Sequence, residues 1–81
     1  MILQNNWDCY KLENVIYDFS ESSFITITFD FEVLKSYDYL ENPKYSRIEL
    51  VVENNLPYTM LLKKIFEKCE ETIDNTPSLM I

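Results

Sequence analysis

The sequence contains no glycine and no histidine among its 81 residues. Both common phosphate-binding loop fingerprints depend on glycine, so neither can be present. Without histidine, the most frequent general base and the most frequent metal ligand are also missing. Cysteine and serine could serve as nucleophiles, but no base partner for them is recognisable in the sequence. We therefore predict that the chain is not an enzyme and that it binds no cofactor and no metal ion.

The lack of glycine also places a conformational demand on other residues. Backbone positions that need a positive φ favour glycine, and asparagine or aspartate is the next best choice. We expect these positions to fall on asparagines at or near turns and element ends: Asn5, Asn6, Asn42, Asn54, Asn55 and Asn75.

Cysteine is scarce, and the two cysteines, Cys9 and Cys69, lie far apart in the sequence. They form no CxxC pair, and there is no histidine to complete a zinc site with them. The N-terminal stretch has no basic region and no small-residue cleavage site, so it does not resemble a secretory signal. Free thiols are therefore favoured over a bridge, which stays open. The expected compartment is the cytoplasm, or the host cytoplasm if a phage encodes the chain.

Basic residues are outnumbered, with 7 Lys and Arg against 14 Asp and Glu, giving a formal net charge of −7 at pH 7. Nucleic acids and anionic membranes are bound through clustered Lys and Arg, so neither is expected as a direct ligand. The apolar runs are also too short to span a bilayer. Acidic charge instead steers a small protein toward basic protein surfaces. The aromatic content of 15% is typical of a folded domain rather than a disordered chain.

Segment 24–34 alternates between apolar and polar residues, which predicts a β-strand with one buried face. The apolar residues share one side: Ile25, Ile27, Phe29, Phe31 and Val33. The polar residues share the other: Thr26, Thr28, Asp30 and Glu32. An earlier strand is predicted over 13–19, and placing Tyr17 opposite Ile27 brings the apolar residues of both strands into one core. The connecting loop then has an odd length, and five residues suit a glycine-free turn better than three.

A third strand is predicted over 45–53, and a helix follows from Pro57 in its first turn to a cap at Asn75. The helix carries apolar residues at helical spacing: Leu61, Leu62, Ile65, Phe66, Cys69 and Ile73. A short fourth strand lies at either 1–3 or 7–12. The expected fold is α+β, a single compact domain over residues 1–81. It has a three- to four-stranded antiparallel sheet in βββα order with one C-terminal helix packed on one face.

Acidic residues are expected to gather on the sheet face that the helix leaves open, with Arg47 as the one outward base. They are Asp18, Asp30, Glu32, Glu49 and Glu53. A second acidic surface is expected at the C-terminal end of the helix, where negative charge is unfavourable for the helix macrodipole. Its residues are Glu70, Glu71 and Asp74. A third group lies in the connection between strands, where tyrosines are typical of interfaces: Tyr37, Asp38, Tyr39 and Glu41. We predict that these residues contact a partner, although solvated surface is the plainer interpretation of each carboxylate.

In size and charge the chain resembles small phage anti-defence proteins, including anti-CRISPR proteins and other DNA mimics. That resemblance implies a stoichiometric inhibitor whose carboxylates stand in for phosphates on a basic, nucleic-acid-binding surface. An immunity protein or antitoxin that neutralises a basic nuclease toxin fits the same physics. A third interpretation is a structural or assembly subunit that self-associates through sheet edges or apolar termini. The expected partner is a basic protein, either a nuclease or a nucleic-acid-binding effector, and the expected state is a monomer or homodimer.

Overall fold

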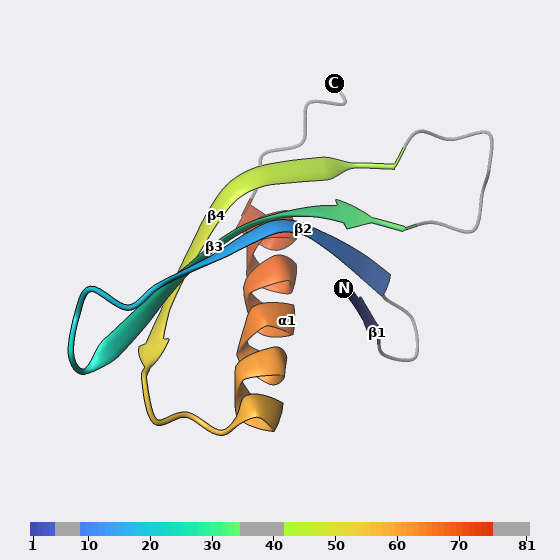
Figure 1. Ribbon diagram of the computed structural model, residues 1–81. Helices are drawn as coiled ribbons and strands as arrows, with labels where there is room; N and C mark the ends of the chain where they lie inside the picture. The colour runs from blue at the N-terminus through green and yellow to red at the C-terminus, as the bar shows by residue number, and fades with distance from the viewer. Residues whose placement is uncertain (5–8, 35–41, 76–81) are drawn as a thin grey trace.

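The computed structural model describes residues 1–4, 9–34 and 42–75. Within these ranges four antiparallel strands precede one helix: β1 (Ile2–Gln4), β2 (Cys9–Asp18), β3 (Phe24–Val33), β4 (Lys44–Glu53) and α1 (Tyr58–Asn75). The strands neighbour one another in chain order, β1-β2-β3-β4. The sheet is bent, and α1 lies inside the bend (Figure 1). The predicted α+β class, with an antiparallel sheet and one C-terminal helix, is confirmed.

The core lies between β3 and α1. Ile27, Phe29 and Phe31 of β3 are each at most 2% exposed, on the face that the alternating pattern predicts. From the helix, Ile65 and Cys69 are buried as well, because residues four apart share one helix face. The other strands complete the buried set: Leu3, Tyr10, Leu12 and Val52.

The predicted pairing of the first long hairpin is confirmed, since Tyr17 lies opposite Ile27. β2 is longer than expected: it begins at Cys9, so residues 9–12, the described part of the candidate segment 7–12, belong to it. The brief strand at the N-terminus is present as β1. β2 ends at Asp18 and β3 begins at Phe24, so the loop between them, 19–23, has the five residues that a glycine-free turn favours.

Two β-bulges flank β3 at mid-strand. In β2, Asn14 and Val15 together lie opposite one residue, Phe29. In β4, residues 46–47 together lie opposite Asp30. An extra residue of this kind bends its strand and increases the local twist. Because the bulges sit on both sides of β3 at neighbouring positions, they account for a sheet that curves around α1.

Among the residues that the structure describes, the positive-φ positions are Asn14, with φ of 53°, and Arg47, with φ of 58°, and both lie in the bulges. The prediction that turn asparagines would take this conformation is wrong for Asn54, Asn55 and Asn75. For Asn42 it stays a prediction, because the preceding residue lies outside the described ranges. Asn5 and Asn6 lie outside the described residues. The physical reason is that each of these two bulges holds a left-handed residue inside a strand, a demand that an argument from turns does not consider.

Both cysteines are free, and they differ in burial. Cys69 is 0% exposed, and its burial, with a smaller effect of the Glu70 carboxylate, raises the pKa of its thiol to about 12. Since the thiolate is the reactive form, we expect iodoacetamide to modify the half-buried Cys9 in the native protein and to spare Cys69. In denaturant both should react, as mass spectrometry of tryptic peptides can show. Fast native labelling of Cys69 would contradict the packing of α1 on the sheet.

Candidate functional site

The candidate site is the open face of the sheet, on the side away from α1. Side chains alternate between the two faces of a strand, so the cross-strand pairs define this face. The bulges divide it into two halves. We call one the ion-paired half: Lys11, Glu13, Asp30, Glu32 and Lys44. We call the other the apolar half: Ile16, Asp18, Phe24, Thr26, Thr28, Glu49, Val51 and Glu53.

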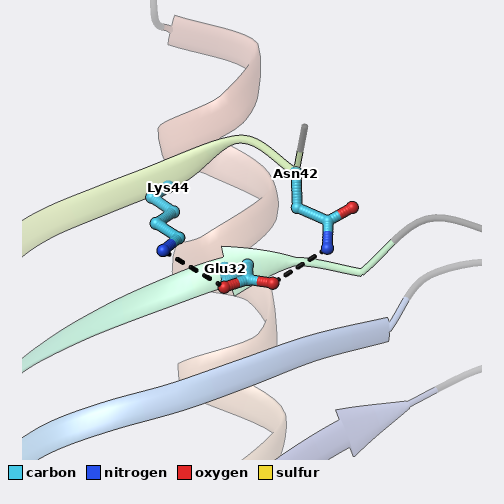
Figure 2. A network of polar contacts seen from close by, with 3 residues as sticks. All are labelled: Glu32, Asn42 and Lys44. Atoms are coloured by element: carbon cyan, nitrogen blue, oxygen red, sulfur yellow. Dashed lines mark hydrogen bonds and ion pairs between the residues drawn. The ribbon is translucent and has the colours of Figure 1, made fainter. Parts of the chain in front are cut away.

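Glu32 is held by two neighbours in the ion-paired half. Its Oε1 lies 3.7 Å from Nζ of Lys44, and the Glu32 side chain is only 17% exposed. Its Oε2 accepts a hydrogen bond of 2.8 Å from Nδ2 of Asn42. Figure 2 shows the carboxylate between these two side chains. With both oxygens in contact and a cation beside one of them, Glu32 offers a partner little negative charge.

Asp30 joins the two bulges. Its Oδ2 accepts a hydrogen bond of 2.8 Å from Nδ2 of Asn14, and its Oδ1 accepts one of 2.9 Å from the backbone N–H of Arg47. The donors are therefore the two residues with positive φ. These hydrogen bonds, that from Asn14 first, hold the pKa of the Asp30 carboxyl below its ordinary value. The Asp30 carboxylate thus stabilises the two bulges that curve the sheet.

Two lysines change the charge of this half from what the sequence suggests. Lys11 lies opposite Glu32 on one side and Lys44 lies opposite it on the other, so the row reads positive, negative, positive. The sequence alone predicts Arg47 as the one outward base and indicates neither lysine. It also gives no sign of Glu13, which the register places opposite Asp30.

Apolar side chains are exposed at the centre of the other half. Ile16 is 62% exposed and lies opposite Thr28, while Val51 is 53% exposed and lies opposite Thr26. Phe24 is exposed next to them in the sheet. Together with the threonine methyl groups they form an apolar centre that crosses all three long strands. Exposed apolar groups gathered in this way are typical of interaction surfaces.

Carboxylates surround this apolar centre. Glu49 and Glu53 are exposed on β4, and neither carboxylate has an ion pair or hydrogen bond with any other residue that the structure describes. Asp18 accepts a hydrogen bond of 2.9 Å from the backbone N–H of Ser20, which lowers the pKa of the Asp18 carboxyl. Asp18 thus closes the turn after β2 and keeps its charge at the border of the apolar half.

The acidic residues of α1 form a separate surface, because the helix packs on the opposite face of the sheet (Figure 1). Glu71 lies 3.5 Å from Lys68, Glu70 is half-buried, and Asp74 is exposed. The structure therefore does not bring them together with the acids of the open face. The remaining candidates, Tyr37, Asp38, Tyr39 and Glu41, lie outside the described residues. Whether any of these residues contacts a partner stays a prediction.

The described parts of the chain hold no group of three or more His, Cys, Asp or Glu side chains that could bind a metal ion. Within the same ranges, no helix combines the length and apolar character needed to cross a membrane. Comparison with protein-family models, curated proteins and solved structures finds no match. The geometry of the open face is therefore the basis for a functional proposal.

Proposed function

We propose that this protein is a protein-binding inhibitor that docks the apolar half of its open sheet face on a basic protein. The observation that carries the proposal is the exposed apolar centre of Ile16, Phe24 and Val51, bordered by the carboxylates of Glu49 and Glu53. Interfaces commonly have this composition, an apolar centre that excludes water and a polar rim. The net charge of −7 adds long-range attraction to a basic partner.

The chemistry of the surface defines the chemistry of its partner. The partner needs an apolar patch to cover Ile16 and Val51, with Lys or Arg side chains around it to meet the carboxylates. Basic surfaces of that kind bind nucleic-acid phosphates, so occupation by this protein would exclude nucleic acid. We place the protein in the class of phage anti-defence inhibitors. In such an inhibitor the apolar centre would supply most of the affinity. The acidic border would supply speed of association and selectivity.

The direct test is competition. Purified nucleases and nucleic-acid-binding effectors would be immobilised as a panel, and binding of this protein would be measured at low and at high salt. We expect a bound target whose association slows as salt rises, because salt screens the acidic border. We also expect DNA or RNA to compete for that target. Binding that nucleic acid leaves unaffected would contradict the inhibitory mechanism.

Charge reversal locates the surface. Glu49→Lys together with Glu53→Lys is expected to weaken binding to such a target at least about tenfold, because both acids border the apolar centre. The matched control is Glu71→Lys together with Asp74→Lys on α1, which changes the net charge by the same amount on the other side of the sheet. We expect the control to bind almost as well as the natural protein. Equal weakening by both pairs would assign the effect to overall charge, and weakening by the control alone would move the site to α1.

A further inference from the structure

The two edges of the sheet differ in how well they are protected. β4 forms one edge and carries a bulge and four charged residues: Lys44, Arg47, Glu49 and Glu53. Bulges and charges of this kind prevent an edge strand from pairing with another chain. β1 forms the other edge, and its three residues, Ile2, Leu3 and Gln4, include no charge and no bulge. Of the two edges of the described sheet, β1 is therefore the one less protected against pairing with another strand.

The hydrogen bonds of β1 show which of its backbone groups face outward. The backbone N–H of Leu12 donates to the carbonyl of Met1 at 2.8 Å, and the Met1 amino group donates to the carbonyl of Leu12 at 3.5 Å. Bonded and non-bonded pairs alternate along an antiparallel ladder. Leu3 is therefore bonded to Tyr10, whereas the N–H and C=O groups of Ile2 and Gln4 point away from β2.

A groove of about 530 Å³ lies between β1 and α1. Figure 1 shows β1 beside the helix, at the edge of the sheet. The groove is lined by Ile2 and Leu3 on one side and by Leu62 and Phe66 on the other. Its charged residues are ordered along the helix, with Lys63 nearer the start of α1 and Glu67 and Glu70 nearer its end.

We propose that a second copy of this chain occupies the groove, so that the protein is a two-fold symmetric dimer. With the two-fold axis at Leu3 and perpendicular to the sheet, Ile2 of each copy pairs with Gln4 of the other. Their outward N–H and C=O groups then form hydrogen bonds and join the sheets into one of eight strands. Both helices lie on the same face and run antiparallel, with Leu62 and Phe66 of the two copies in contact.

Charge complementarity selects a second copy over another partner. When two copies of α1 run antiparallel about Phe66, Lys63 of each copy faces Glu70 of the other, with Glu67 close by. The same surface is therefore its own complement, as a two-fold interface requires. The apolar half of the open face stays free in this dimer, because it lies on the opposite side of the sheet from the helices. Dimerisation and docking on a basic protein are thus independent, and the failure of one leaves the other untouched.

The first test uses the natural chain and two variants at Gln4. Sedimentation velocity over a wide range of protein concentration should show a monomer that converts to a dimer. Gln4→Pro removes an outward N–H, and proline is tolerated where the N–H of an edge strand faces solvent, so the variant should fold normally and dimerise at least tenfold more weakly. Gln4→Ala keeps the N–H and should dimerise like the natural chain. A natural chain that stays monomeric throughout, or a Gln4→Pro variant that dimerises fully, would overturn the proposal.

A charge exchange tests the orientation of the helices. Lys63→Glu makes the helix side of the groove wholly acidic, and Glu67→Lys with Glu70→Lys makes it wholly basic, so neither variant should pair with itself. Mixing the two should restore dimers, because each acidic groove then faces a basic one. Recovery in the mixture, measured by sedimentation, supports the antiparallel arrangement. Two variants that each dimerise alone, or a mixture that stays monomeric while the natural chain dimerises, would refute it.

Discussion

Replacing Phe29 with alanine is expected to lower the free energy of unfolding by about 3–5 kcal/mol. The Phe29 side chain is 1% exposed, its ring centroid lies 6.1 Å from that of Phe31, and a bulge of β2 sits directly opposite it. A cavity at this position would open between the curved sheet and α1. Small domains have a total stability of about 5–15 kcal/mol, so the variant should lose much of it. Urea denaturation followed by circular dichroism measures the change.

The matched control is Phe24→Ala, on the same strand and on the open face. Phe24 is 47% exposed, so its removal empties no cavity and should change the free energy of unfolding by about 1 kcal/mol or less. Equal losses for the two variants would contradict the assignment of the two faces of β3. The pair therefore tests the single sequence pattern on which the fold prediction depends.

That pattern explains why the fold was predictable. The alternation along β3 fixes which face is buried, and a one-residue slip of β2 would move Tyr17 away from Ile27 and turn Tyr10 and Leu12 out of the core. The helix was predictable for a similar reason, because Pro57 and Asn75 mark its ends and Ile65 and Cys69 repeat at helical spacing. In each case one physical demand, the burial of an apolar stripe, selects one arrangement.

The bulges were not predictable, and most errors follow from them. Asn14 is one of many asparagines in the sequence, and Arg47 resembles any other strand residue. The sequence therefore does not indicate that either has a positive φ. Each bulge shifts the register by one residue, which brings Glu13 opposite Asp30. The local pattern of apolar and polar residues does not predict such an insertion, because a bulge is stabilised by contacts across strands.

The candidate site was predictable in position but not in electrostatics. Glu49 and Glu53 lie on the open face, as the alternation of β4 implies. The neutralisation of Glu32 depends on Lys44 and Asn42, which follow a long connection and reach the carboxylate only after β3 and β4 have paired. A sequence shows how many carboxylates a face receives, whereas the tertiary structure decides which of them remain free.

Replacing Asp30 with alanine is expected to lower the melting temperature by several degrees, more than any other substitution of a single carboxylate on the open face. The carboxylate accepts hydrogen bonds from Asn14 and from the backbone of Arg47, so its removal releases both bulges together. Thermal unfolding followed by circular dichroism measures the effect. Glu53→Ala is the control, because the Glu53 carboxylate accepts no hydrogen bond from any residue that the structure describes. A melting temperature that falls equally in both variants would contradict the structural role of Asp30.

The pH dependence of stability separates this role from the charge that Asp30 would present to a partner. The folded state lowers the pKa of Asp30, so the carboxylate stabilises the protein above the pKa of the unfolded chain, about 3.9. This stabilisation is lost as the pH falls through the lower pKa of the folded state. Asp30→Asn keeps the shape and can keep both hydrogen bonds if the Asn14 amide turns over. It should therefore melt above Asp30→Ala at neutral pH and lose less stability than the natural protein on acidification. An unchanged acid dependence would show that the two bulges do not rely on the ionised carboxylate. Asp30 would then be available, like Glu49 and Glu53, to a basic partner.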